Sequence, residues 1–220
     1  FKNDPIFKAK AIMILLILIL LVLHQPFTFS QSAKQFLEKG SIMAERGELQ
    51  KAVTYFSRSI KLDSTEACAY LSRGDSRRML EDYKGAIEDY SRAILLSSED
   101  YRGYFKRAIT NSLLKDYASA LRDYDSAVKL NPGSDEVLFG RGCAKYFSRD
   151  YEGAISDFSE ALSLNGDNEL IAFSRGAARE DKGDITGAIE DYRLAAKINP
   201  EFKTMEYFIR RAKEKMKTAK

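Results

Sequence analysis

The stretch that decides the fold is residues 86–96, AIEDYSRAILL, because similar stretches recur along the chain every 34 residues. The recurrences are AVTYFSRSIKL (52–62), ALRDYDSAVKL (120–130), AISDFSEALSL (154–164) and AIEDYRLAAKI (188–198). Each has Ala first, an aromatic residue fifth, a small residue eighth and Leu or Ile last. Self-similarity at a fixed period predicts a repeat architecture.

Around these stretches, ungapped windows of 34 residues begin at Ala33, Ala67, Tyr101, Asp135 and Glu169. Position 20 of every window is Ala, position 24 is aromatic, and position 8 is Gly or Ala. Apolar residues at positions 20, 21, 24, 27 and 28 have helical spacing, so they form one stripe on the second helix of a pair. The small residues at positions 8 and 20 indicate where two backbones approach closely, since packed interiors leave no room for longer side chains.

Turn-forming residues separate the expected helices, for example at Gly47-Glu48 and Gly183-Asp184 between the two helices of a window, and at Asn199-Pro200 after the second helix of the last window. A single helix pair cannot bury its apolar stripe, so successive pairs stack and each contacts mainly its neighbours. The sequence therefore predicts an all-α solenoid of five helix pairs and a capping helix. The expected segments are 33–66, 67–100, 101–134, 135–168, 169–202 and, for the cap, 203–220.

The pattern resembles the tetratricopeptide repeat (TPR) family, which has a small residue at position 8, Ala at 20, an aromatic at 24, Ala at 27 and Pro at 32. The resemblance covers residues 33–202. Position 32 is proline only at Pro132 and Pro200, and the aromatic often found at position 4 is replaced by Leu138 and Ala172 in the last two windows. Neither departure threatens the fold. The resemblance implies a right-handed superhelix whose concave wall is lined by the first helix of each pair.

Positions 7 and 23 predict an ion pair. Position 7 is Arg and position 23 is Asp in windows two to five, whereas the first window has Lys39 and Tyr55 there. Because the two residues appear and disappear together, we expect them to join the two helices, either within a window or across a junction. The expected pairs are Arg73–Asp89, Arg107–Asp123, Arg141–Asp157 and Arg175–Asp191.

The first thirty residues differ from the repeats. Lys8 and Lys10 precede an apolar run at 11–23. This run is followed by Pro26 and by the small residues Thr28 and Ser30, as before a signal-peptidase cleavage site. A helix of that run is about 20 Å long, shorter than the ~30 Å hydrocarbon core of a membrane. Residues 1–30 are therefore expected to be a secretory signal cut after Ser30, which places the rest in the periplasm, in the cell envelope or outside the cell. The alternative is an uncleaved membrane anchor at 11–23.

The expected cap, residues 203–220, places Met205, Ile209, Ala212 and Met216 on one face and Lys and Arg on the others. Such a helix covers the last repeat with its apolar face and leaves the rest in water. The alternative is a basic surface that docks weakly on anionic lipid or on an acidic partner.

The composition argues against an enzyme. The one histidine, His24, lies in the targeting segment, so the repeats lack the commonest general base and the usual zinc ligand. Neither a phosphate-binding loop nor a nucleophile elbow is present, and no cofactor or metal is expected. A net charge of +3 is too small to indicate a nucleic-acid partner. Cys68 and Cys143 are too far apart in the repeat pattern to form a disulfide, and each is expected to be a buried or groove residue.

The TPR resemblance implies a site for a protein or peptide partner in the concave groove. In the family, positions 2, 5, 9, 12 and 13 face the ligand. The family's carboxylate clamp is rejected, because only its last basic pair, Arg102 and Lys106, is matched. The middle of the groove is expected to be apolar and aromatic, which suits an amphipathic helix or an extended segment with bulky anchors. The expected groove residues are Arg78, Arg102, Phe105, Lys106, Ile109, Phe139, Tyr146, Phe147 and Phe173.

Two alternatives remain open for these side chains: the rings can simply pack between neighbouring helices, and the cations can simply be solvated. Three alternatives remain open for the function. The first is an exported scaffold that holds a partner, for example in assembling an envelope complex. The second is a membrane-tethered spacer that self-associates. The third is the accessory domain of a longer protein, since the chain opens on Phe1 rather than Met.

Overall fold

The computed structural model describes residue 13 and residues 31–201 and 204–218. These residues form helices and short turns, and none of them is in a strand. The predicted fold class, an all-α arrangement of stacked TPR-like helix pairs, is confirmed. The expected signal segment, its alternative anchor at 11–23 and the cleavage site after Ser30 lie outside the described residues, apart from Met13.

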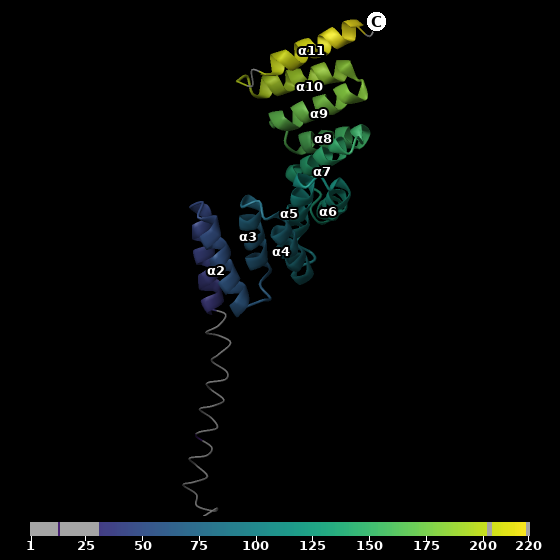
Figure 1. Ribbon diagram of the computed structural model, residues 1–220. Helices are drawn as coiled ribbons and strands as arrows, with labels where there is room; N and C mark the ends of the chain where they lie inside the picture. Colours follow the sequence, from purple (N-terminus) through teal and green to yellow (C-terminus); the bar gives the residue numbers. More distant parts are fainter. Residues whose placement is uncertain (1–12, 14–30, 202–203, 219–220) are drawn as a thin grey trace, which may run out of the picture. The chain divides into compact units, whose positions relative to one another are not determined.

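The chain divides into two compact units, Phe1–Leu96 and Ser97–Lys220. In the second unit, α9, α10 and α11 follow one another side by side (Figure 1). The first unit contains the helix of residues 31–45 followed by α2 (Leu49–Leu62), α3 (Ala67–Met79) and α4 (Tyr83–Leu96). The second contains α5 (Tyr101–Leu113), α6 (Tyr117–Leu130), α7 (Asp135–Phe147), α8 (Tyr151–Leu164), α9 (Glu169–Lys182), α10 (Ile185–Ile198) and α11 (Thr204–Thr218).

The core of each pair is a ring packed against a backbone. A Cβ added to Gly142 on α7 would lie 2.6 Å from the ring of Phe158 on α8, and one on Gly176 would lie 2.8 Å from the ring of Tyr192. No side chain fits there without displacing the ring. The alanine at position 20 is fully buried in all five pairs. The small residues at positions 8 and 20 and the aromatic at 24 therefore form one packing unit, as the sequence predicts.

The turn inside each pair has one left-handed residue, always at position 15. It is Gly47 (φ 75°) or Gly183 (φ 100°) in two pairs, and a residue with a side chain in the other three. Those three are Glu81 (φ 63°), Lys115 (φ 61°) and Arg149 (φ 67°).

The predicted ion pairs are confirmed in all four repeats. Arg141 Nε and Nη2 each donate to a different oxygen of Asp157 at 2.8 Å, and the side chain of Asp157 is only 3% exposed. Of the two expected locations, within a window or across a junction, the first is found for every Arg–Asp pair. The carboxylate belongs to the same pair, while Nη1 of Arg141 reaches back to Asp125 of the preceding one. Nη1 of Arg73 and Nη1 of Arg175 likewise donate to serine hydroxyls of the preceding pair, Ser57 and Ser159.

Position 11 supplies a second partner for these aspartates. Arg77 and Arg179 each donate at 2.9 Å to the aspartate of their own repeat, and Lys145 lies 2.9 Å from Asp157. Asn111 holds the equivalent place beside Asp123. A buried carboxylate thus meets two donors from the first helix, and these additional interactions offset the desolvation penalty of the pair.

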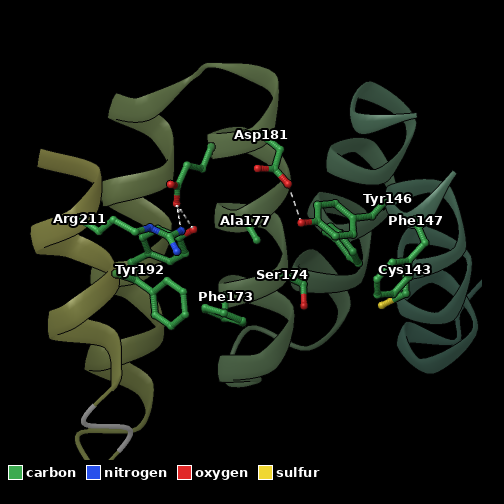
Figure 2. A pocket seen from close by; sticks show the side chains of 12 residues that line it. Cys143, Tyr146, Phe147, Phe173, Ser174, Ala177, Asp181, Tyr192 and Arg211 are labelled. Carbon is green, nitrogen blue, oxygen red and sulfur yellow. Dashed lines mark hydrogen bonds and ion pairs between the residues drawn. The ribbon is translucent and has the colours of Figure 1, made fainter. Parts of the chain in front are cut away.

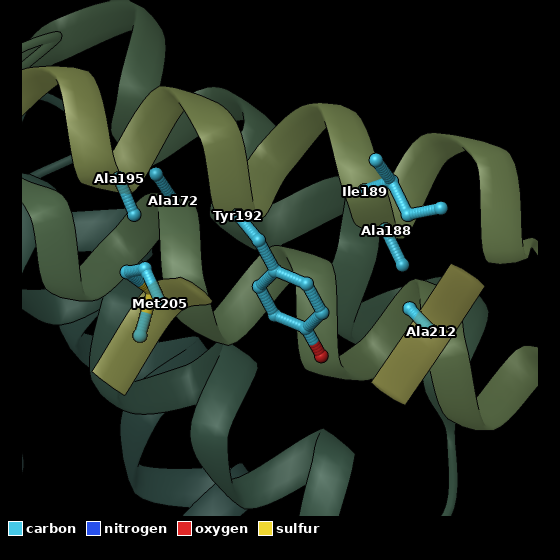
Figure 3. Close-up of a cluster of buried hydrophobic side chains, with 7 residues drawn as sticks. All are labelled: Ala172, Ala188, Ile189, Tyr192, Ala195, Met205 and Ala212. Atoms are coloured by element: carbon cyan, nitrogen blue, oxygen red, sulfur yellow. The ribbon is translucent and has the colours of Figure 1, made fainter. Parts of the chain in front are cut away.

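α11 continues the 34-residue register as the first helix of a sixth pair. Met205 and Ala212 are buried against α10, at positions 3 and 10, where α9 has Ile171 and Ala178. Figure 3 shows Met205 and Ala212 on either side of the Tyr192 ring. Met216, which was expected on this packed face, is 40% exposed instead.

Candidate functional site

The aromatic residues at position 5 of α5, α7 and α9 form a row in the second unit. The rings of Phe139 and Phe158 lie 5.7 Å apart between centroids, as do those of Phe173 and Tyr192, and Phe105 lies 6.2 Å from Tyr124. Each position-5 ring is half-buried. One side of each ring contacts the aromatic core of its own pair, while the remainder borders a hollow.

Three hollows run along these first helices. The first, about 370 Å³, includes Phe105, Ile109 and Phe139 in its lining. The second, about 220 Å³, shares Ile109, Tyr124 and Gly140 with the first and includes Leu113. The third, about 410 Å³, shares Cys143 and Phe147 with the second and reaches Phe173. Because neighbouring hollows share wall residues, they form one groove along α5, α7 and α9, which we call the aromatic groove.

The third hollow is the largest, and Figure 2 shows its walls. Tyr146 and Phe147 line it from α7, Phe173 and Asp181 from α9, and Arg211 from α11. The Tyr146 hydroxyl donates to Asp181 Oδ2 at 2.6 Å. Burial, followed by this bond to a carboxylate, raises the pKa of the Tyr146 phenol, so it remains a neutral donor at physiological pH.

Large apolar side chains stay exposed along one edge of the groove. Phe147 is 62% exposed and Leu113 51% exposed, both at position 13 of their repeats. Tyr117 stacks on Phe147 with centroids 5.8 Å apart and planes 12° apart. An exposed apolar edge beside a hollow is the kind of surface at which protein partners bind.

Comparison with known proteins identifies the repeat. The sequence model of the tetratricopeptide repeat matches residues 66–135 and 139–201, more than half of the chain. The chain belongs to the TPR family. No curated protein sequence matches it.

Solved TPR structures share the fold at low sequence identity. YrrB is 20% identical, with a TM-score of 0.69 over 81% of this chain and 96% of its own. MamA from Desulfovibrio magneticus RS-1 is 17% identical, with a TM-score of 0.73 over 78% of this chain and 97% of its own. PilF of Pseudomonas aeruginosa is 18% identical, with a TM-score of 0.69 over 78% of each chain.

The structure places the sequence-predicted site residues in two groups. The first group lines the aromatic groove: Phe105, Ile109, Phe139, Tyr146, Phe147 and Phe173. The second group is cationic and does not line it. Arg102 is bound to Asp100 at 2.6 Å, Lys106 lies one turn further along α5, and Arg78 lies on α3 of the second TPR, in the first compact unit.

Position 12 of the fifth TPR, one of the positions expected to face a ligand, is Glu180, which borders the third hollow but is only 4% exposed. The structure buries its side chain beneath α11, where it accepts hydrogen bonds from Tyr192, Arg211 and Lys215 at 2.6–2.7 Å. Two basic residues of the cap, Arg211 and Lys215, remain partly exposed to water, as expected, but their charged ends also bind this carboxylate. Burial pushes the pKa of Glu180 upward, but the three hydrogen bonds outweigh it and hold that pKa below its usual range.

The cysteines are both free. Cys143 lies in the floor of the groove, where burial raises the pKa of its thiol to about 11. It is therefore a small neutral residue there. Cys68 was expected to be buried or in the groove, but it is exposed on α3.

Sequence reasoning missed three groove residues. Tyr124 is the position-24 core ring, yet its edge borders two hollows, and burial raises its pKa to about 12. Tyr117 belongs to a second helix, and Phe208 belongs to the cap and packs edge-on against Phe173 at 4.9 Å. The repeat pattern offers no signal for Phe208, because it lies at position 6 of the sixth window, and Lys106 at the same position of the third window does not line the groove.

In the described part of the chain, no cluster of His, Cys, Asp and Glu is suited to hold a metal ion. Nor does any described helix combine the length and apolar character that a membrane crossing requires.

Proposed function

We propose that this TPR chain is a non-catalytic scaffold that holds an apolar segment of a partner protein in the aromatic groove of α5, α7 and α9. The observation that carries the proposal is the continuity of the three hollows, which present half-buried rings in a row. A helix or extended peptide with bulky side chains fits such a row, because each anchor fills one hollow while the exposed edge excludes water.

The known relatives are compatible with this function. YrrB is described as a TPR protein with an unusual peptide-binding site. At 20% identity that likeness supports the fold, and the peptide site of YrrB serves only as an example of what the fold can hold.

We also propose that the scaffold acts after export, in the cell envelope or outside the cell. The support is the sequence of residues 1–30, where a basic flank, a short apolar run and small residues before Gln31 are typical of a cleaved signal. The mass of the protein recovered from its source cells tests this: a chain that starts at Gln31 supports export, and one that keeps 11–23 supports a membrane tether.

Photo-crosslinking tests the groove. A photoreactive phenylalanine analogue at Phe139 should capture a partner in the source cells, since this ring borders the first hollow. The same analogue at Glu160, exposed on α8, is the control. Phe147→Ala combined with Leu113→Ala should abolish capture at Phe139 with little change in melting temperature, because both side chains are more than half exposed. Equal capture from Glu160, or capture that survives the double substitution, would contradict the proposal.

A further inference from the structure

Aromatic rings from three helices gather at the junction of the second and third hollows. Phe147 stacks on Tyr117 and meets Tyr146 edge-on at 5.4 Å, and Tyr146 packs against Tyr151 at 5.8 Å. Tyr146 and Phe147 both line the largest hollow. Tyr146 and Phe147 therefore border this hollow as part of a cluster of four rings.

Asp181 stands beside these rings as a carboxylate without a cation. It accepts the Tyr146 hydroxyl through Oδ2, and none of the described basic side chains forms an ion pair with it. The other charges nearby are paired with one another. Glu180 binds Arg211 and Lys215, and Lys182 lies 3.4 Å from Glu152. The charges of Glu180, Asp181, Arg211 and Lys215 therefore sum to zero. Both cations are directed to Glu180, however, so Asp181 is the carboxylate of this hollow to which no described cation is paired.

We infer that Tyr146, Phe147 and Asp181 form a receptor for one cationic side chain, a Lys or an Arg, on the partner segment held by the aromatic groove. The inference rests on the proposed function and names the chemistry of the partner: an apolar segment that carries a basic residue next to its bulky anchors. An acidic partner, as the carboxylate clamp of other TPR proteins requires, would meet Asp181 unfavourably.

The chemistry of the receptor follows from its parts. An ammonium or guanidinium group over an aromatic ring is attracted by the negative face of the ring, and more so where water is partly excluded. Asp181 adds an ion pair, and the neutral Tyr146 phenol fixes one of its oxygens through the hydrogen bond that it donates. The Cys143 thiol in the same wall is neutral, so it does not compete for the cation.

Defined peptides test the receptor with the full chain. The probes are acetylated and amidated 16-residue helical peptides with Leu at i, i+4 and i+7, one terminal Trp, and one variable residue beside the Leu stripe. The variable residue is Lys, Arg, Gln or Glu, placed in turn at four positions. The chain contains no Trp, so Trp fluorescence anisotropy reports the peptide alone. Lys and Arg peptides should bind about two- to fivefold more tightly than the Gln peptide, and the Glu peptide most weakly.

Two substitutions should remove that preference. Asp181→Asn keeps an acceptor for Tyr146 and deletes the charge, and Phe147→Leu keeps an apolar side chain and deletes the ring. Each should bring the Lys and Arg peptides about two- to fivefold closer to the Gln peptide. Glu160→Gln deletes an equal charge from an exposed position of α8 and should leave the preference for Lys and Arg peptides unchanged.

The outcomes separate the two proposals. If Lys, Arg and Gln peptides bind equally, or if Asp181→Asn leaves the preference intact, the receptor is wrong while the aromatic groove stands. If no peptide of the set binds, the groove does not hold apolar helices, and the receptor fails with the proposed function.

Discussion

At the scale of the residue, position 15 of the repeat has a left-handed backbone conformation, which is energetically unfavourable in the three pairs where the residue is not glycine. Glu81, Lys115 and Arg149 adopt the left-handed conformation, which is about 1–2 kcal/mol unfavourable for residues with a Cβ. Gly47 and Gly183 adopt it without that penalty. The position is therefore set by the turn between the helices and not by the residue that happens to occupy it.

Lys115→Gly and Arg149→Gly should each stabilise the protein, by about 0.5–1 kcal/mol. The relief of left-handed strain exceeds the extra entropy that glycine gains in the unfolded chain. Urea unfolding monitored by circular dichroism measures the effect. Glu160→Gly inside α8 is the matched control and should destabilise by about 1 kcal/mol, because its backbone is helical. Equal effects at residues 115 and 160 would contradict the interpretation.

The buried pair Arg141–Asp157 should behave as a coupled unit. Replacing either Arg141 by Met or Asp157 by Leu should cost about 3–5 kcal/mol of unfolding free energy, because a charge loses its main partner in a buried place. The double substitution should cost clearly less than the sum. The exposed pair Lys182–Glu152 provides the comparison, with a coupling of about 0–1 kcal/mol. Additive losses at 141 and 157 would show that the two side chains act independently.

Some residue-scale features could be predicted from sequence and some could not. The Gly–aromatic contacts and the Arg–Asp pairs recur as fixed residue types, so spacing alone reveals them. The second partner at position 11 was missed because its chemistry varies between Arg77, Asn111, Lys145 and Arg179. The reach of Arg141 to Asp125 was missed because it depends on how two neighbouring pairs stack.

At the scale of the element, Glu180 on α9 adds hydrogen bonds from Arg211 and Lys215 to the apolar packing that holds α11 on the fifth repeat. Glu180→Gln should weaken that attachment by about 1–3 kcal/mol, since the hydrogen bonds from Arg211 and Lys215 lose their charge. Hydrogen exchange should show faster exchange of the α11 amides while α7 and α8 stay protected. Glu160→Gln is the control for a carboxylate on an outer helix. Unchanged exchange in α11 would mean that its apolar face alone holds it.

Acid should release α11 for the same reason. The pKa of Glu180 is lower in the folded protein than the value of about 4.3 expected for the unfolded chain. A depressed pKa contributes stability above the unfolded value and loses it as pH falls through the folded value. Protection of the α11 amides should therefore hold from pH 7 to about pH 5 and decline below about pH 4. In Glu180→Gln this decline should be absent.

The sequence predicts that the last element is a cap, but not how the cap is held. Met205, Ile209 and Ala212 already share one face in a helical pattern, and that face is the packed one. The inward turn of Arg211 and Lys215 depends on Glu180, which lies on another helix more than thirty residues earlier. Likewise, the pattern identifies the rings of the groove, whereas the hollows between them arise from the spacing of α5, α7 and α9.

At the scale of the whole molecule, each pair depends mainly on its neighbours, so damage should remain local. Ala154 is fully buried in the fourth repeat, and Ala154→Leu should destabilise it by about 1–3 kcal/mol or more through overpacking. Hydrogen exchange should accelerate in α7, α8 and α9, while residues 31–96, which belong to the other compact unit, keep their protection. Glu160→Leu on the same helix is the exposed control. Uniform acceleration along the chain would indicate one cooperative fold.

The register of α11 has a consequence for how such a protein can grow. Position 8 of each complete pair is Gly or Ala, pressed against the ring at position 24 in four of the pairs described, whereas α11 carries the exposed Arg210 there. A second helix added after α11 would meet this long side chain where a bare backbone is needed. Copies of the 34-residue unit can therefore be accommodated between existing units more readily than directly against α11, since only the complete pairs present a small residue at this contact.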